Sequence, residues 1–179
     1  MFKLGNIQYD LFQNHFFKIL EFMRLILANY LKDIYHLDMI TEHDNNESIS
    51  IDESLFVHDN HNQIWVFGMI NNSSRIIRLE ILENRAQSHI KKIIERLVPK
   101  GNRIVTNNAA CYNFLSNIDS GYNHSIHIHG HGDFGEGLDS TSHIKQLWNH
   151  LKHLIKEIYN AIPSNIFVLF LREAEWGRN

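Results

Sequence analysis

The sequence lacks the features of a secreted or membrane-spanning protein. Its single cysteine, Cys111, excludes an internal disulfide bond and is typical of a reducing, intracellular compartment. Charged side chains interrupt the most apolar region, 16–31, so no run is long enough to cross a bilayer. No secretory leader with an apolar core and a cleavage site is visible. We therefore expect an intracellular protein without membrane association, nuclear if its source is a eukaryote.

An excess of basic charge is also absent. The net charge is -3 with neutral histidines, whereas a free-standing DNA-binding domain is usually clearly basic. Bulk charge thus gives no support for nucleic-acid binding. The 179 residues, 44% of them hydrophobic and 21% charged, are sufficient for one globular domain with a real core, or for one domain with an appendage.

The apolar spacing divides the chain into two parts. Residues 12–34 carry apolar side chains at helical intervals, which predicts an amphipathic N-terminal helix. The polar and acidic segment 41–48 is typical of a linker. We therefore assign 1–40 to an N-terminal helical segment and 49–179 to the main domain.

The main domain is predicted to alternate strands and helices. Alternating apolar runs at 48–58, 63–70 and 75–82, joined by short polar turns, predict three antiparallel strands. A helix that ends at Pro99, a strand at 103–106, a short helix at 109–115 and a strand at 125–129 follow. Two further helices are expected at 142–159 and 165–175. This order predicts an α/β fold of the ribonuclease H-like type, a mixed sheet flanked by helices.

Five segments, in order and at suitable intervals, resemble a known family. They are SIDESLF at 50–56, IWVFG at 64–68, GNRIVTN at 101–107, STSHIKQLW at 140–148 and FLREAEW at 170–176. Together they resemble the catalytic domain of Merlin-type transposases and the related ISXO-like insertion-sequence transposases. The resemblance implies a DDE domain that cleaves and transfers DNA strands during DNA transposition, with Mg²⁺ or Mn²⁺ as cofactor. It also implies DNA as a partner and leaves homo-oligomer formation open.

The resemblance places the three catalytic acidic positions at Asp52, Asn107 and Lys145. Asp52 is retained and would be the metal ligand if any metal bound. Asn107 stands where the family has aspartate, and Lys145 stands where it has glutamate. Because Mg²⁺ requires hard oxygen ligands, these two substitutions predict that no metal is bound and that the domain is catalytically inactive. Lys145 is then expected to form an ion pair with Asp52 in place of the metal.

Several other polar residues have two interpretations. His129, His131 and Ser142 are accessory candidates near the same site. The histidines at 124, 127, 129, 131 and 143 are either a zinc cluster or hydrogen-bonded structural residues. The acidic residues at 133, 136 and 139 are either substitute metal ligands or turn residues. The latter interpretation is favoured in both cases.

The remaining charged and aromatic residues are assigned to the surface and the core. The basic residues at 91, 92, 96, 100 and 103 are either DNA-backbone contacts or the solvated face of a helix, and we favour the second. Glu53 follows Asp52 on the opposite face of the strand and is expected to be solvated. Trp65, Trp148 and Trp176 are interpreted as packing residues.

Three rival interpretations remain open at this point. The first is an active nuclease that uses Asp52 with unconventional metal ligands. The second is a non-catalytic module, repurposed to bind DNA or protein. The third is a remnant without a selected role. Metal-dependent nicking would favour the first, and salt-sensitive affinity for duplex DNA would favour the binding module.

Overall fold

A mixed five-stranded sheet forms the centre of the computed structural model, which describes residues 15, 18–27, 29–30, 47–57, 63–127, 140–159, 162 and 164–176. Its strands are β1 (Ile49–Val57), β2 (Gln63–Asn71), β3 (Ile77–Leu82), β4 (Arg103–Thr106) and β5 (Asn123–Ile126). The order across the sheet is β3-β2-β1-β4-β5. The first three strands are antiparallel, whereas β4 and β5 run parallel to β1. The predicted meander followed by alternating helices and strands is confirmed.

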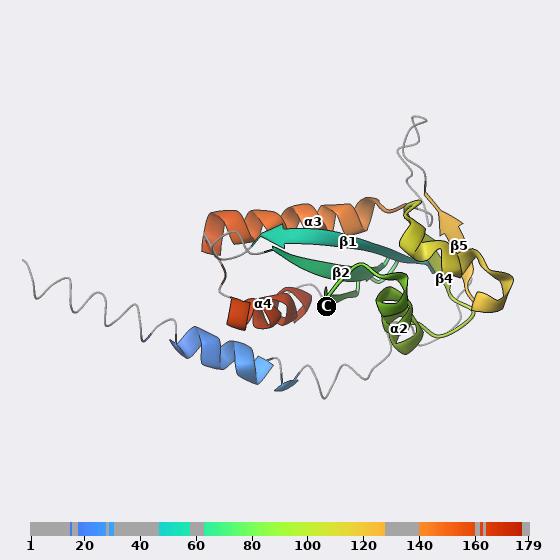
Figure 1. Cartoon of the computed structure of the whole chain (residues 1–179). Helices are drawn as coiled ribbons and strands as arrows, with labels where there is room; N and C mark the ends of the chain where they lie inside the picture. Colours follow the sequence, from blue (N-terminus) through green and yellow to red (C-terminus); the bar gives the residue numbers. More distant parts are fainter. Residues whose placement is uncertain are drawn as a thin grey trace, which may run out of the picture.

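Helices cover both faces of this sheet (Figure 1). They are α2 (Gln87–Leu97), α3 (Ser142–Leu154) and α4 (Ser164–Trp176), with the 3-10 segments η2 (Ala110–Ser116) and η3 (Ile118–Ser120). The last turns of the helix predicted at 142–159 form a π-helical segment, η4 (Ile155–Tyr159). The predicted strand at 125–129 was placed too late, because β5 spans Asn123–Ile126 and pairs along its whole length with β4.

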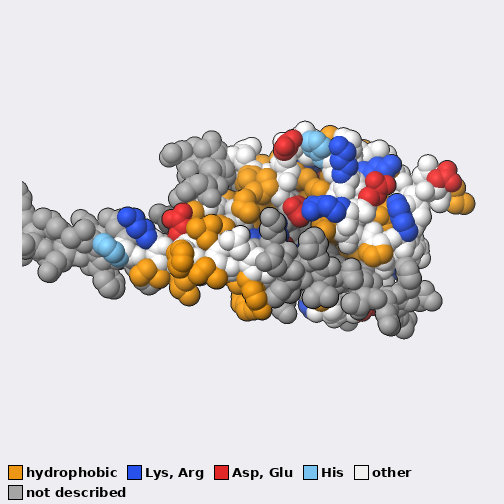
Figure 2. Space-filling view, turned by 90° about the horizontal axis from the view of Figure 1, so that it is seen from below, with side chains coloured by type: hydrophobic (Ala, Val, Ile, Leu, Met, Phe, Trp, Pro, Cys, Tyr) orange, Lys and Arg blue, Asp and Glu red, His pale blue; other side chains and the backbone are white. Residues whose placement is uncertain are grey.

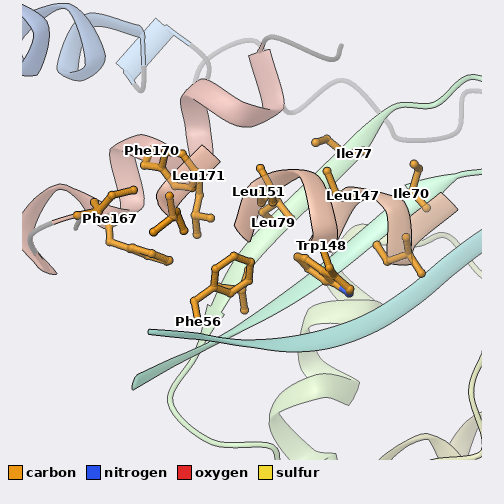
Figure 3. Packing of buried hydrophobic residues seen from close by; sticks show 14 residues of the cluster. Phe56, Ile70, Ile77, Leu79, Leu147, Trp148, Leu151, Phe167, Phe170 and Leu171 are labelled. Atoms are coloured by element: carbon orange, nitrogen blue, oxygen red, sulfur yellow. The ribbon is translucent and has the colours of Figure 1, made fainter. Parts of the chain in front are cut away.

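Two apolar clusters, one on each face, hold the layers together. The first joins α3 and α4 to the sheet, with Trp148 and Phe167 both packed edge-on against Phe56, as Figure 3 shows. The second joins α2 and η2 to the opposite face through residues such as Ile51 and Ile90. Full burial of each such side chain stabilises the fold by about 1.5–3 kcal/mol. Because side chains alternate along β1, this strand contributes residues to both clusters.

Helix α4 also protects the outer edge of the sheet. Glu175 accepts a hydrogen bond from the backbone N–H of Leu79 at 2.6 Å, and Arg172 donates to the Leu79 carbonyl at 3.1 Å. An edge strand otherwise exposes such groups to other chains. Burial raises the pKa of Glu175, although the neighbouring Arg172 acts in the opposite direction.

Residues 15, 18–27 and 29–30, well before the sheet, are helical. Residues 18–27 and 29–30 lie within the predicted amphipathic helix, whereas most of the expected linker lies outside the described residues. In the part of the chain that the structure describes, no helix combines the length and apolar character needed to cross a membrane.

Candidate functional site

The first two of the three predicted catalytic positions, Asp52 and Asn107, meet at the junction of β1 and β4. These strands are parallel with Ile49 opposite Ile104, so Asp52 and Asn107 lie at the same level, three residues further along. The Asn107 side-chain amide donates a hydrogen bond to Asp52 Oδ1 at 3.1 Å. The spacing of 55 positions in the sequence is thus converted by the fold into direct contact.

The orientation of Asn107 is fixed by its own loop. Its Oδ1 accepts the backbone N–H of Ala109 at 3.0 Å, which turns the amide nitrogen toward Asp52. Asn107 therefore presents its side-chain N–H to Asp52, while its side-chain oxygen binds the backbone just before η2. An aspartate at this position would instead present a second negative oxygen.

The third position lies on α3, one helical turn before Trp148. The expected ion pair between Lys145 and Asp52 is not formed, and the second carboxylate oxygen of Asp52 contacts Trp148 instead. The indole Nε1 donates to Asp52 Oδ2 at 3.1 Å. Lys145 acts on Asp52 only through its charge. Residues three apart on a helix share a face, which explains why lysine and indole approach the same carboxylate.

Burial raises the pKa of Asp52, and the negative charge of Glu53 contributes in the same direction. The Trp148 hydrogen bond and the positive charge of Lys145 lower it. These opposed effects on the pKa reflect a carboxylate that is largely removed from water but accepts hydrogen bonds within the domain. Trp148 is a packing residue as predicted, buried in the first apolar cluster, but its polar edge also belongs to this site.

These residues do not fit a divalent metal ion. Both Asp52 oxygens already accept N–H groups, Asn107 aims a donor into the site, and Lys145 brings a positive charge. Mg²⁺ needs several oxygen ligands arranged around it. Over the described ranges, no group of three His, Cys, Asp or Glu side chains lies close enough to hold a metal ion together.

Two of the predicted histidines, His124 and His143, are held by separate partners. His124 lies between Thr106 and Ser116, at 2.8 Å from each hydroxyl, and His143 lies 3.2 Å from the Asn72 side-chain oxygen. Burial lowers the pKa of both histidines. These contacts favour the structural interpretation over the zinc cluster. His129 and His131, like the acidic residues at 133, 136 and 139, lie outside the described residues.

Ser142, the third accessory candidate, begins α3 beside the site. Its hydroxyl accepts a hydrogen bond from Ser140 at 2.7 Å, and the Ser140 hydroxyl also accepts the Ser142 backbone N–H. The Ser140 carbonyl in turn accepts from Ser50 on β1. This chain of bonds fixes the start of α3 against the strand that carries Asp52.

Comparison with known proteins decides the family. The model of the ISXO2-like transposase domain matches residues 41–179. The chain belongs to this family of DDE-type transposase domains. A comparison with curated proteins gave no match.

Solved structures similar to this transposase-family chain include retroviral integrases. A chain of the simian T-cell lymphotropic virus intasome, solved with a PP2A regulatory subunit, is 15% identical with a TM-score of 0.50. The match covers 73% of the transposase-family chain but 47% of the viral chain, about half its length. The HTLV-2 integrase catalytic core, solved with magnesium, is 13% identical with a TM-score of 0.48, over 75% and 85% of the two chains. The predicted ribonuclease H-like fold is confirmed.

Glu53 corrects one prediction for this transposase-family domain. Rather than being solvated, its carboxylate is almost fully buried on the α2 side of the sheet. Arg85 Nε donates to it at 2.9 Å, and the Tyr112 hydroxyl donates to its other oxygen. Arg85 also lies over the Trp65 ring, 4.5 Å from its centre. Alternation along β1 correctly put Glu53 opposite Asp52, but α2 and η2 cover that face.

The basic residues around α2 are largely occupied within the domain. Lys91 and Lys100 both approach Glu95, at 3.9 and 3.5 Å, and Arg96 contacts Glu80 at 3.1 Å. Surface pairs of this kind contribute little to stability, but they reduce the net positive potential of the patch. The arrangement supports the interpretation of a solvated helix face over a DNA-backbone contact.

Proposed function

We propose that this chain is a DDE-type transposase domain that no longer performs metal-dependent DNA cleavage and strand transfer. The observation that carries the proposal is the Asn107 amide, which donates to Asp52 where the family places a second carboxylate. The amide nitrogen thus places a hydrogen-bond donor where a divalent cation would need an oxygen ligand. DNA is the substrate that family membership implies for an active relative.

Lys145 supports the same conclusion through charge. Replacing glutamate by lysine changes the local charge by two units beside a half-buried carboxylate. Two unit charges 4 Å apart interact by about 4 kcal/mol at an effective dielectric constant of 20. A reversal of that sign opposes the binding of any divalent cation at Asp52.

Metal titration of the full chain tests the proposal. We expect no Mn²⁺ or Mg²⁺ binding by calorimetry for the unaltered protein, and binding for the double variant Asn107→Asp with Lys145→Glu. The matched control is Asn108→Asp with Lys156→Glu, which makes the same chemical changes at exposed positions outside the site. The control should bind no more metal than the unaltered protein.

A nicking assay on supercoiled DNA separates inactivity from unconventional catalysis. We expect no metal-dependent nicking by the unaltered chain at any Mn²⁺ concentration. Nicking that disappears in Asp52→Asn would overturn the proposal and establish the active-nuclease alternative. Calorimetric binding of Mn²⁺ by the unaltered chain that is lost in Asp52→Asn would likewise contradict it.

A further inference from the structure

The helical residues 18–27 and 29–30, which precede the matched family domain, pack against α4. Arg24 Nε donates to Glu173 at 2.7 Å, and the Tyr30 ring meets the Trp176 ring edge-on with centres 6.2 Å apart. Leu20 and Leu27, which share the face of Arg24, are partly buried. One side of this helix therefore packs against the domain.

A second side of the same helix is apolar and exposed. Ile19, Phe22, Met23 and Ile26 follow the spacing of a single helical stripe, and their exposed fractions are 57%, 64%, 60% and 54%. Figure 2 shows hydrophobic side chains gathered along the helix that precedes the domain. Contiguous apolar patches of this kind mark interaction sites on soluble proteins.

We propose that this stripe is a self-association surface, on which the helix pairs antiparallel with the same helix of a second copy. The stripe is symmetrical about a point between Phe22 and Met23. A two-fold axis there sets Ile19 of each copy opposite Ile26 of the other, and Phe22 opposite Met23. Two-fold interfaces require such a self-complementary patch, and a methionine sulfur packs favourably on an aromatic ring.

The exposed area is sufficient for a dimer. A fully covered aromatic side chain buries about 150–250 Å², so a half-exposed one offers roughly 100 Å². Applied to the stripe and its exposed apolar neighbours Leu25, Tyr30 and Trp176, this gives about 700 Å² per copy, close to the roughly 800 Å² per partner of a standard interface.

The charges beside the stripe favour a second copy over a lipid surface. Helices that lie on membranes carry many Lys and Arg residues on their polar face. Among residues 18–27 and 29–30, the basic side chains are Lys18 and Arg24, and Arg24 is engaged by Glu173. Lipid binding is therefore the outcome that the test must exclude.

Sedimentation equilibrium on the full chain tests self-association. We expect a concentration-dependent dimer whose dissociation constant rises at least about 30-fold in Phe22→Glu, the loss typical of an interface hot spot. The matched control is Ile118→Glu, because Ile118 is a 95% exposed apolar residue on η3. The control should dimerise like the unaltered chain, and circular dichroism should show both variants folded.

Disulfide formation tests the antiparallel register in a Cys111→Ser background. A mixture of Ile19→Cys and Ile26→Cys chains should cross-link, whereas neither variant alone should. In the antiparallel pair, the same position in the two copies is offset by seven residues along the helices, or roughly 10 Å. A single variant therefore cannot cross-link with itself, because a disulfide requires Cα atoms within about 7 Å. Cross-linking of a single variant with itself would overturn the pairing. A chain that stays monomeric up to about 1 mM, a concentration far above the dissociation constants of ordinary dimers, would overturn the self-association surface. This holds whether or not the chain binds phosphatidylserine vesicles.

Discussion

Gly68 and Trp148 fit together beneath Asp52. Gly68 is the partner of Asp52 in the neighbouring strand, and a Cβ atom at Gly68 would collide with the six-membered ring of the indole. The missing side chain is what allows Trp148 to lie against the sheet and reach the carboxylate. The glycine in the IWVFG segment thus has a steric role in the site.

Gly68→Ala is expected to lower the free energy of unfolding by about 1–3 kcal/mol, as overpacked core positions do. The added methyl group must displace the indole, which also weakens its hydrogen bond to Asp52. Urea denaturation measures the loss. In a Trp148→Phe background the colliding ring atoms are absent, so the same substitution should cost much less, and equal costs in both backgrounds would contradict the steric explanation.

Trp148→Phe alone should remove the N–H donor to Asp52 while keeping an aromatic ring against Phe56. A hydrogen bond to a charged group contributes about 1.5–3 kcal/mol, so the unfolding free energy should fall by at least that amount. Because this bond lowers the pKa of Asp52, its loss should raise that pKa further. Carboxyl-carbon NMR titration would show the shift, and an unchanged Asp52 titration would contradict the hydrogen bond.

The fold was predictable because strand alternation and turn residues are local signals. The three antiparallel strands and the strand at 103–106 were predicted from apolar alternation and short polar turns, and the structure forms them with small changes at their ends. The end of β5 was not predicted correctly. Its pairing depends on β4, and its own sequence, NHSI, is weakly apolar. Pairing partners of short polar strands are a tertiary property.

The contact between Asp52 and Asn107 was predictable, but the other bonds around them were not. Family spacing placed Asp52 and Asn107 together, and the parallel strands bring them into contact. The indole donor could not be predicted, because a tryptophan on an apolar helical face is usually a core residue. Glu53 was placed on the correct face, but its burial depends on Arg85 and Tyr112, which are 32 and 59 positions away.

Asn107→Asp is expected to destabilise the protein by about 1–3 kcal/mol in the presence of a chelator. The substitution removes a donor from Asp52 and sets two carboxylates side by side, which raises the pKa of one of them. The deficit should shrink as the pH falls and the pair takes up a proton. Asn108→Asp, one residue further along and exposed, is the control and should be close to neutral in the same denaturation experiment.

Tyr112→Phe is expected to lower the unfolding free energy by about 1.5–3 kcal/mol, because it removes a donor from the buried carboxylate of Glu53. Burial and the charge of Glu53 raise the pKa of Tyr112 well above its ordinary range, so the hydroxyl remains a donor at neutral pH. Thermal and urea denaturation provide the measurement. In a Glu53→Gln background the cost should be smaller, since the acceptor is no longer charged, and an equal cost would argue against the pairing.

The stability of the domain should depend on pH through His124. The Thr106 hydroxyl donates to the Asn107 carbonyl, so His124 Nε2–H donates to Thr106, and Nδ1 accepts from Ser116. Burial lowers the folded-state pKa of His124 below its ordinary value of 6.5. The unfolded chain then binds more protons, so this contribution is complete above pH 6.5 and is lost as the pH falls toward the folded pKa.

His124→Gln should therefore flatten the fall in unfolding free energy between about pH 7 and pH 5, measured by urea denaturation. Comparison with the variant is required because the raised pKa of Asp52 and that of Glu175 act in the opposite sense, stabilising the folded state as the pH falls toward their range. His153→Gln, at an exposed position of α3, is the control and should leave the pH profile unchanged. If His124→Gln and the unaltered chain have the same profile, the Thr106–His124–Ser116 contact does not couple protonation to folding, and another group carries the acid sensitivity.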